Sequence, residues 1–396
     1  MTNIPLIVEN LKEIEDFRHA RGQRYKLYNL LTMSILAIVA GSDDFESMAT
    51  FCEMRSSFLS KHGLLEGERI PSHDLFRWIF MHLDKTGFAF FLSAWLEAML
   101  SDAIEGNKSF LPSENADPSI IHAKMIHVDG KSLRATRTSE HTRTALQIVS
   151  AYCSNLSLTL GQSIIDSKSC EKTAIPELLN LLDLKYAVVT IDAIATSKKN
   201  TEKIIAKGGD YILALKKNNQ LLYADVDAFF DDLDATDIYT KDYFQTIDNQ
   251  HGRTEIRTCR IIDDLDYFPN AEQWYNLKSV VCIDTQRTIK GKETSYEKRY
   301  YLTSLPSNSK QLQYGIRKHW SVENQLHWQL DVAFNEDKSR LKDKNAAAVF
   351  ATMRRFALAV IKNAKISQQS IKTQRLQAAW NDDFLDKLFK ILKKTY

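Results

Sequence analysis

Apolar residues recur at every third or fourth position through the first hundred residues of the chain, which is the spacing of one face of an α-helix. Proline, serine and glycine stand at several ends of these periodic segments, as they do at helix boundaries. The segments predict four helices, over residues 26–41, 45–63, 71–84 and 88–106. We therefore expect residues 1–110 to form a helical N-terminal region, followed by a polar linker at 107–119.

After residue 120 the pattern changes to short apolar runs separated by turns, which is typical of β-strands. The run at 186–192 is apolar throughout until its last residue, as in a strand that is buried on both faces. We expect strands at 124–130, 145–154, 156–166, 186–192 and 211–216, and helices at 173–184 and 198–209. Three strands followed by alternating helices and strands predict an α/β fold over 120–235, with a mixed sheet covered by helices.

The alternation of helix and strand stops near residue 236. Residues 236–306 contain three further strand-like segments, at 254–263, 277–284 and 297–305, and we interpret this region as a β-rich insertion. A helical pattern resumes at about Ser309 and continues through 345–364. Residues 307–396 are therefore expected to complete the α/β core with helices and to end in a basic tail.

The composition is that of an ordinary globular protein, with 44% hydrophobic and 26% charged residues in 396. No apolar run is long enough for a membrane span, and the N-terminus lacks the pattern of a signal peptide. The five cysteines are scattered without a CxxC pair, so they predict small buried apolar residues in a reducing compartment. The sequence therefore indicates a cytoplasmic protein without a membrane partner.

Charge is unevenly distributed along the chain. Residues 1–110 carry 11 Lys and Arg against 15 Asp and Glu, a net charge of −4, whereas residues 303–396 carry 17 against 8, a net charge of +9. A basic C-terminal part is compatible with a polyanionic partner, although a solvated charged surface would have the same composition.

Three carboxylates stand where chemistry is expected. Asp129 and Asp192 each follow an apolar strand, and ligands of open sheets collect beyond strand carboxyl ends. Glu323 lies on a helical segment at steps of three or four from Trp320 and His327, so the three should share one face. We expect this face to be buried, and a buried carboxylate needs a cation, a strong donor or a proton.

Carboxylates that converge repel one another unless cations neutralise them, and Mg²⁺ is the hard divalent ion that such oxygens hold. Asp129 and Asp192 have a second interpretation as helix caps or turn residues. Glu323 has a second interpretation as the partner of an arginine such as Arg317, in which case Glu336 and Asp337 are the next candidates. A zinc site at His319, Glu323 and His327 is disfavoured, because the chain has neither an HExxH motif nor a cysteine nearby.

Nearly the whole chain resembles the DDE transposases of bacterial insertion sequences, in the group that includes the H-repeat-associated proteins. The similarity is carried by "DFRHARGQRYKLYNLLTMSILAIVAG", "IHVDGKSLRAT", "AIPELLNLLDLKYAVVTIDA", "KGGDYILALKKNNQ", "HGRTEIR" and "IRKHWSVENQLHWQLDVAFNEDKSR". The resemblance implies a ribonuclease-H-like catalytic core in which Asp129, Asp192 and Glu323 are catalytic and hold Mg²⁺, with Mn²⁺ as a substitute. It also implies a β-rich insertion between the second Asp and the Glu.

The chain departs from the family pattern around the catalytic Glu. Related transposases carry Tyr, Arg, Glu and Lys at fixed spacing, and here Tyr314 and Arg317 would fill the first two positions, with a longer step from Arg to Glu. Leu330 stands where the Lys is expected, so Lys338 or Arg340 would supply that phosphate contact.

Other residues are candidates for DNA contact. His327 is expected beside the carboxylates or on DNA, and Trp274 either stacks on an extruded base or is a buried aromatic residue. A basic stretch after Asp129 either grips phosphates or forms a solvated edge; it contains Lys131, Arg134, Arg137 and Arg143.

The expected function is DNA transposition, by metal-dependent cleavage at the ends of the element and transfer of the freed 3′-hydroxyl into target DNA. The partners would be the terminal inverted repeats and target DNA, and joining two ends implies a homodimer on DNA. The N-terminal helices would read the repeats. A metal-dependent nuclease without strand transfer and a DNA-binding protein without catalysis are the alternatives.

Overall fold

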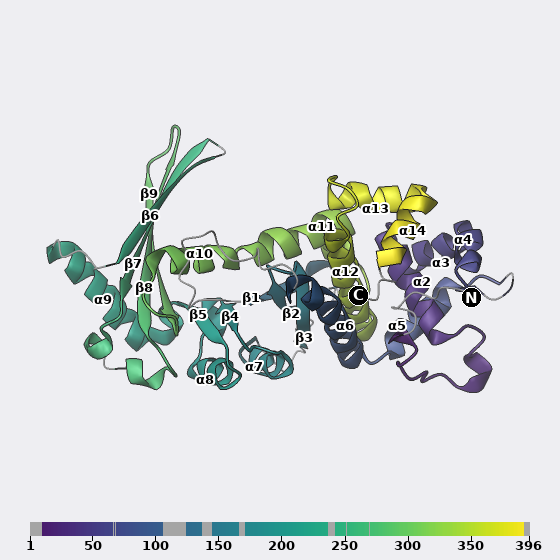
Figure 1. Ribbon diagram of the computed structural model, residues 1–396, viewed down its shortest axis with the longest axis horizontal. Coiled ribbons are helices and arrows are strands. Elements are labelled where there is room, and N and C mark those ends of the chain that lie inside the picture. Colours follow the sequence, from purple (N-terminus) through teal and green to yellow (C-terminus); the bar gives the residue numbers. More distant parts are fainter. Residues whose placement is uncertain are drawn as a thin grey trace.

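A nine-stranded mixed sheet forms the centre of the computed structural model (Figure 1). The structure describes residues 10–65, 67, 69–105, 124–136, 145–165, 171–236, 242–250, 252–268 and 270–391. The strands are β1 (Lys124–Leu133), β2 (Leu146–Cys153), β3 (Leu158–Ile165), β4 (Ala187–Ile191), β5 (Asp210–Leu215), β6 (Tyr243–Gln250), β7 (Arg253–Ile262), β8 (Ser279–Ile289) and β9 (Ser295–Thr303). Their order is β3-β2-β1-β4-β5-β9-β8-β7-β6, with β1, β4 and β5 parallel and all other pairs antiparallel.

Strand β4 is covered on both faces, which confirms the interpretation of its apolar run. Val188 packs on one face against Ile316 of helix α10 (Ser309–His319). Val189 belongs to the core on the other face, which includes residues of α7 (Glu171–Leu181) and α8 (Lys198–Ala206). Successive residues of a strand point to opposite faces, so a strand between two helical layers has no polar side.

The strands of the β-rich region extend the central sheet. Strand β9 pairs antiparallel with β5, and β8, β7 and β6 follow outward. In Figure 1 they rise together beside α9 (Gln220–Thr236), at the end of the molecule remote from the N-terminus. The three strands predicted here are confirmed as β7, β8 and β9. Strand β6 and helix α9 were not predicted.

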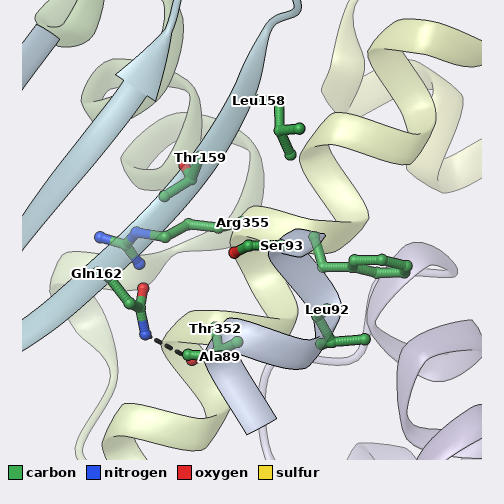
Figure 2. A pocket seen from close by; sticks show the side chains of 9 residues that line it. Ala89, Leu92, Ser93, Leu158, Thr159, Gln162, Thr352 and Arg355 are labelled. Atoms are coloured by element: carbon green, nitrogen blue, oxygen red, sulfur yellow. Dashed lines mark hydrogen bonds between the residues drawn. The ribbon is translucent and has the colours of Figure 1, made fainter. Parts of the chain in front are cut away.

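Helix α12 (Lys344–Ala364) lies between the sheet and the N-terminal helices. Every residue from Ala346 to Ile361 is buried, so the helix has no solvent-facing stripe. A cavity of about 20 Å³ lies where α12 meets β3 and α6 (Lys85–Glu105). Figure 2 shows the side chains that line it, beside the Gln162–Thr352 hydrogen bond. A cavity of this size has room for a single water molecule and no larger ligand.

The N-terminal region is helical, as predicted, and packs on α12 together with the C-terminal helices. The predicted helix 45–63 divides at Arg55 into two. The helices are α2 (Leu27–Val39), α3 (Phe45–Met54), α4 (Ser56–Lys61), α5 (His73–His82), α6 (Lys85–Glu105), α13 (Ile371–Trp380) and α14 (Asp382–Ile391). The predicted linker at 107–119 lies outside the described residues.

Two expectations from composition can be compared with the described part of the chain. None of its helices combines the length and apolarity that crossing a membrane requires. Its four cysteines are buried, as expected for small apolar side chains; they are Cys52, Cys153, Cys259 and Cys282.

A buried cluster of charges joins α12 to the sheet. Glu336 is fully buried, and its Oε1 lies 2.7 Å from Nη1 of Arg355 while its Oε2 lies 3.8 Å from Nζ of Lys131. Burial alone would raise the pKa of Glu336, but the charges of Arg355, Lys131 and Arg354 outweigh this effect and lower it. Glu336 is therefore a structural ion-pair residue that holds α12 against β1.

Replacing Glu336 by Gln should destabilise the fold by about 3–5 kcal/mol at pH 7, because the buried cations lose their counter-charge. Since the pKa of Glu336 is lowered on folding, its contribution is complete above the ordinary pKa of Glu and is lost as pH falls through the lowered value. Urea unfolding should therefore show a large difference from wild type at pH 7 and a shrinking one in acid. The exposed Glu53→Gln is the control, and a loss as small as its own would refute the assignment.

Candidate active site

Asp129 and Asp192 lie next to each other on parallel strands. The last residues paired between β1 and β4 are Val128 and Ile191, and each aspartate is the next residue of its chain. Asp192 also accepts a hydrogen bond of 2.7 Å from the backbone N–H of Ala193, so it caps a short 3₁₀ turn as well. The register of two neighbouring strands thus brings together carboxylates that are 63 residues apart in sequence.

Glu323 reaches the same place from a different element. It lies in the π-helical segment Val322–His327, which follows α10 and leads into α11 (Trp328–Phe334). Glu323, Asp129 and Asp192 all line one cavity of about 560 Å³. The structure therefore places all three residues around the same cavity.

The expectation that Glu323 sits on a buried face is wrong. Glu323 is exposed to the cavity, and Trp320 is 45% exposed. The π turn holds one residue more than an α-turn, so the face predicted from a regular α-helix does not continue through it. The buried side consists instead of Leu312, Ile316, Val322, Leu326 and Leu330.

Each aspartate has a nitrogen neighbour in the cavity. Nζ of Lys216 lies 3.3 Å from Oδ1 of Asp192, and Nδ1 of His327 lies 3.6 Å from Oδ2 of Asp129. Burial raises the pKa of Asp192, but the Ala193 N–H, Lys216 and His319 together lower it below its ordinary value. Asp192 is therefore held as an anion, with an exposed and flexible lysine as its cation.

The histidines around the carboxylates are neutral. His127 Nδ1 lies 2.7 Å from the hydroxyl of Thr190, which lies 2.8 Å from Nδ1 of His319. Burial, with nearby cations, lowers the pKa of His127 and His327 to about 3 and that of His319 to about 4. Neutral imidazoles do not cancel the charge of a carboxylate, so the cavity retains a need for cations.

The donor set fits divalent metal in kind, since carboxylate oxygens are the ligands that Mg²⁺ prefers. Among the described residues, however, no three His, Cys, Asp or Glu side chains are drawn together closely enough to hold an ion. Asp192 turns toward Lys216 and Asp129 lies near His327. Metal binding would therefore require these side chains to rotate into the cavity.

A second cavity, of about 610 Å³, adjoins the first and is lined by residues of β7, β8, β9 and α10. Both are lined by Arg299 and Trp320, with Cζ of Arg299 5.3 Å from the centre of the Trp320 ring. The charged residues that line the second cavity are six bases and two acids: Arg253, Arg257, Arg287, Arg299, Arg317, Lys318, Glu255 and Glu297. We call this second cavity the arginine groove.

The predicted DNA contacts fall into three groups. Tyr314 and Arg317 are exposed and line the arginine groove, where Arg317 pairs with Asp248 at 3.1 Å. Arg134, Lys338 and Arg340 are exposed outside both cavities. Arg137 and Arg143 lie outside the described residues.

Lys131 and Trp274 are both buried, at 9% and 3% exposure. The ammonium of Lys131 pairs with Asp331, Glu336 and Asp337, so it is already used within the protein and we do not retain it as a phosphate contact. Trp274 was interpreted either as a residue that stacks on an extruded base or as a buried aromatic residue, and its burial supports the second interpretation.

Sequence reasoning missed Lys216 and most of the arginine groove. A signal for the groove was present, because Arg253, Glu255 and Arg257 alternate along one strand and so share a face. No local signal marks Lys216, which meets Asp192 only because β4 and β5 are neighbours.

Comparison with known proteins places the chain in a family. The model described as "Transposase DDE domain" matches residues 123–360, and "DDE_Tnp_1-associated" matches residues 8–96. The chain belongs to the DDE transposase family. Its Escherichia coli K12 relatives include "Putative protein YbfL" and "H repeat-associated putative transposase YhhI", 32% and 31% identical over 96% of both chains in each case. "Putative transposase YncI" of E. coli O157:H7 is 30% identical over 98% of this chain and 95% of its own.

Replacing Glu323 by Gln should change the stability of this transposase by less than about 0.5 kcal/mol without metal, because the side chain is exposed. Mg²⁺ or Mn²⁺ should raise the unfolding temperature of the wild type and raise that of the variant much less, since ligand binding stabilises by mass action. Thermal unfolding in EDTA and in divalent metal measures both quantities, with the exposed Glu272→Gln as control. A variant that melts far lower in EDTA, yet keeps the full metal effect, would make Glu323 a structural ion-pair residue.

Proposed function

We propose that the protein is a metal-dependent DNA transposase that cleaves the ends of its element and joins the freed 3′-hydroxyl to target DNA. One observation carries the proposal: carboxylates from two neighbouring strands and one helical segment line a cavity that adjoins an arginine-lined groove. An anionic site suited to divalent cations beside a cationic groove suits the hydrolysis of a bound polyanion.

The strand order supports a ribonuclease-H-like core. We assign this core to β1–β5, with β2 and β3 antiparallel and β1, β4 and β5 parallel. The core would comprise residues 120–235 and 307–396, with 236–306 as its insertion and 1–110 as the region that binds the DNA ends.

Asp129, Asp192 and Glu323 would hold Mg²⁺, or Mn²⁺ in its place. When bound, the ions would supply the activation of water and the neutralisation of phosphate charge. The protein would then contribute mainly orientation and charge, and no side chain needs to become covalently attached to DNA.

The bond changes follow from this arrangement. In the first step a water oxygen forms a bond to phosphorus, and the 3′-oxygen of the element end leaves as a hydroxyl. In the second step that hydroxyl attacks a target phosphodiester, and a target 3′-oxygen leaves. The arginine groove would hold the backbone beside the cavity, and the neutral His319 and His327 would leave the negative charge of Asp192 and Asp129 available to the metal ions.

Two ends must meet for transposition, so we propose that the protein acts as a homodimer on DNA. A nuclease without strand transfer and a DNA-binding protein without catalysis remain the alternatives. A strand-transfer assay with Mg²⁺ separates them, because the first would cut without joining and the second would do neither.

Replacing Asp192 by Asn should abolish strand cleavage while DNA binding stays within about twofold, because the amide keeps the shape and loses the charge that metal binding requires. Cleavage of labelled end DNA and a gel-shift titration measure the two effects. Asp263→Asn, an exposed residue outside both cavities, is the control. Mg²⁺-dependent cleavage by the Asp192 variant at wild-type rate would remove Asp192 from the active site.

Replacing Arg317 by Gln should weaken DNA binding and lower the slope of log affinity against log salt concentration by about 1, the effect of losing one phosphate contact. Binding titrations over a range of salt measure this slope. The control is Lys199→Gln, an exposed change on α8 against the opposite face of the sheet from α10. An unchanged slope would exclude Arg317 from the DNA contacts.

A further inference from the structure

The segment that carries Glu323 has an irregular helical geometry. Residues Val322–His327 form a π turn, and its i-to-i+5 bond runs from the N–H of Trp328 to the carbonyl of Glu323. Such turns are less favourable than α-helix and occur frequently at functional sites. A turn of this kind requires partners elsewhere in the protein to prevent its relaxation to a regular helix.

Two lysines from distant elements supply such partners. Nζ of Lys362, on α12, donates a hydrogen bond of 2.6 Å to the carbonyl of Gln325. Nζ of Lys131, on β1, donates one of 3.4 Å to the carbonyl of His327. The side chain of Gln325 is held as well, because its Oε1 accepts a hydrogen bond of 3.2 Å from the hydroxyl of Tyr152.

The hydrogen bond to the Gln325 carbonyl is the main interaction of the Lys362 ammonium among the described residues. Within the described part of the chain it forms no ion pair with a carboxylate, and its partners are the Gln325 carbonyl and Tyr152, through a 3.4 Å contact to the hydroxyl and a 5.8 Å approach to the ring. Burial lowers the pKa of Lys362 to about 8. A partly buried ammonium costs free energy, and a charged hydrogen bond to a carbonyl recovers it.

The position of the turn links this contact to Glu323. Helix α11 beyond the turn is fixed by buried Leu330 and Phe334, so it cannot rotate freely. Relaxation of the π turn by one residue would rotate the preceding residues by about 100° relative to α11. Glu323 lies on that side of the turn and would leave its place in the cavity.

We propose that Lys362 and Tyr152 are positioning residues that hold the π turn in the register which directs Glu323 into the carboxylate-lined cavity. The proposal rests on the proposed function, in that Glu323 is there a metal ligand. Neither residue touches DNA or the reacting atoms in this scheme. Both act through the backbone and side chain of Gln325.

The first measurement is amide hydrogen exchange in the metal-free full chain. Lys362→Met keeps the length of the side chain and removes the donor, and it should accelerate exchange in the peptide covering residues 322–334 by about tenfold. Lys362→Arg, which keeps a donor, should restore most of the protection. The matched control is Lys372→Met, at an exposed lysine of α13.

The second measurement is Mn²⁺ binding, followed by calorimetry without DNA. Lys362→Met should weaken Mn²⁺ binding by about tenfold, while DNA affinity in EDTA equals that of the control. Tyr152→Phe, which removes only a hydroxyl, should shift exchange and Mn²⁺ affinity in the same direction by less. This variant keeps the test decisive if Lys362→Met does not fold.

Three results would overturn the proposal. In the first, Lys362→Met has the same amide hydrogen exchange and the same Mn²⁺ affinity as the control Lys372→Met. Tyr152→Phe takes the place of Lys362→Met if that variant does not fold. The second is faster exchange with unchanged Mn²⁺ affinity, because Glu323 would then not depend on the turn. The third is wild-type protein that neither binds Mn²⁺ nor cleaves DNA, which contradicts the proposed function and the positioning role with it; the first two contradict the positioning role alone.

Discussion

The parallel register between β1 and β4 is the constraint on which the site depends. Val128 lies opposite Ile191, and both strands then continue into an aspartate. A slip of one residue would turn each side chain of β4 to the other face, where it would not fit the helical layer already packed there, so close packing on both sides opposes it. The fold therefore determines the proximity of Asp129 and Asp192, and neither has to be held there by a dedicated partner.

This proximity has an electrostatic consequence that shapes the surroundings. Two carboxylates side by side, with Glu323 lining the same cavity, favour any cation that can reach them. The helix that leads to Glu323 must also pass close to the sheet, which explains Gly315. A Cβ at that position would lie 2.7 Å from Cδ1 of Ile212 and 3.5 Å from Cε of Met125, so a larger residue would force the end of the Ile212 side chain to move.

The sequence predicts those parts of the fold whose pattern is local. The apolar run of β4, the aspartate at its end and the long helix α12 were all visible in it. Asp129 was predicted at the end of a strand but lies within β1, where it pairs with Ser150. Strand β6 was missed because only alternate residues are half-buried and the rest are exposed, which leaves little apolar signal. The orientation of Glu323 was predicted wrongly because a π turn leaves no distinct mark in the pattern of side chains. Lys131 was interpreted as a surface base because its partners, Asp331, Glu336 and Asp337, lie about 200 residues away.

The acidic N-terminal helices and the basic arginine groove lie at different ends of the molecule (Figure 1). The acidic N-terminal helices are joined to the rest of the chain by partly buried contacts: Asp43 pairs with Arg375 at 3.1 Å and accepts a hydrogen bond of 2.7 Å from Asn335. Asn335 lies directly after α11, so the contact ties the first helices to the segment that begins with Glu323. If residues 1–110 bind the ends of the element as proposed, they do so from a fixed position relative to the carboxylates.

A DNA-binding region of net negative charge contributes little general affinity for a polyanion, and that affinity must come from elsewhere. The arginine groove, at the other end of the same helical connection, is the basic surface placed to supply it.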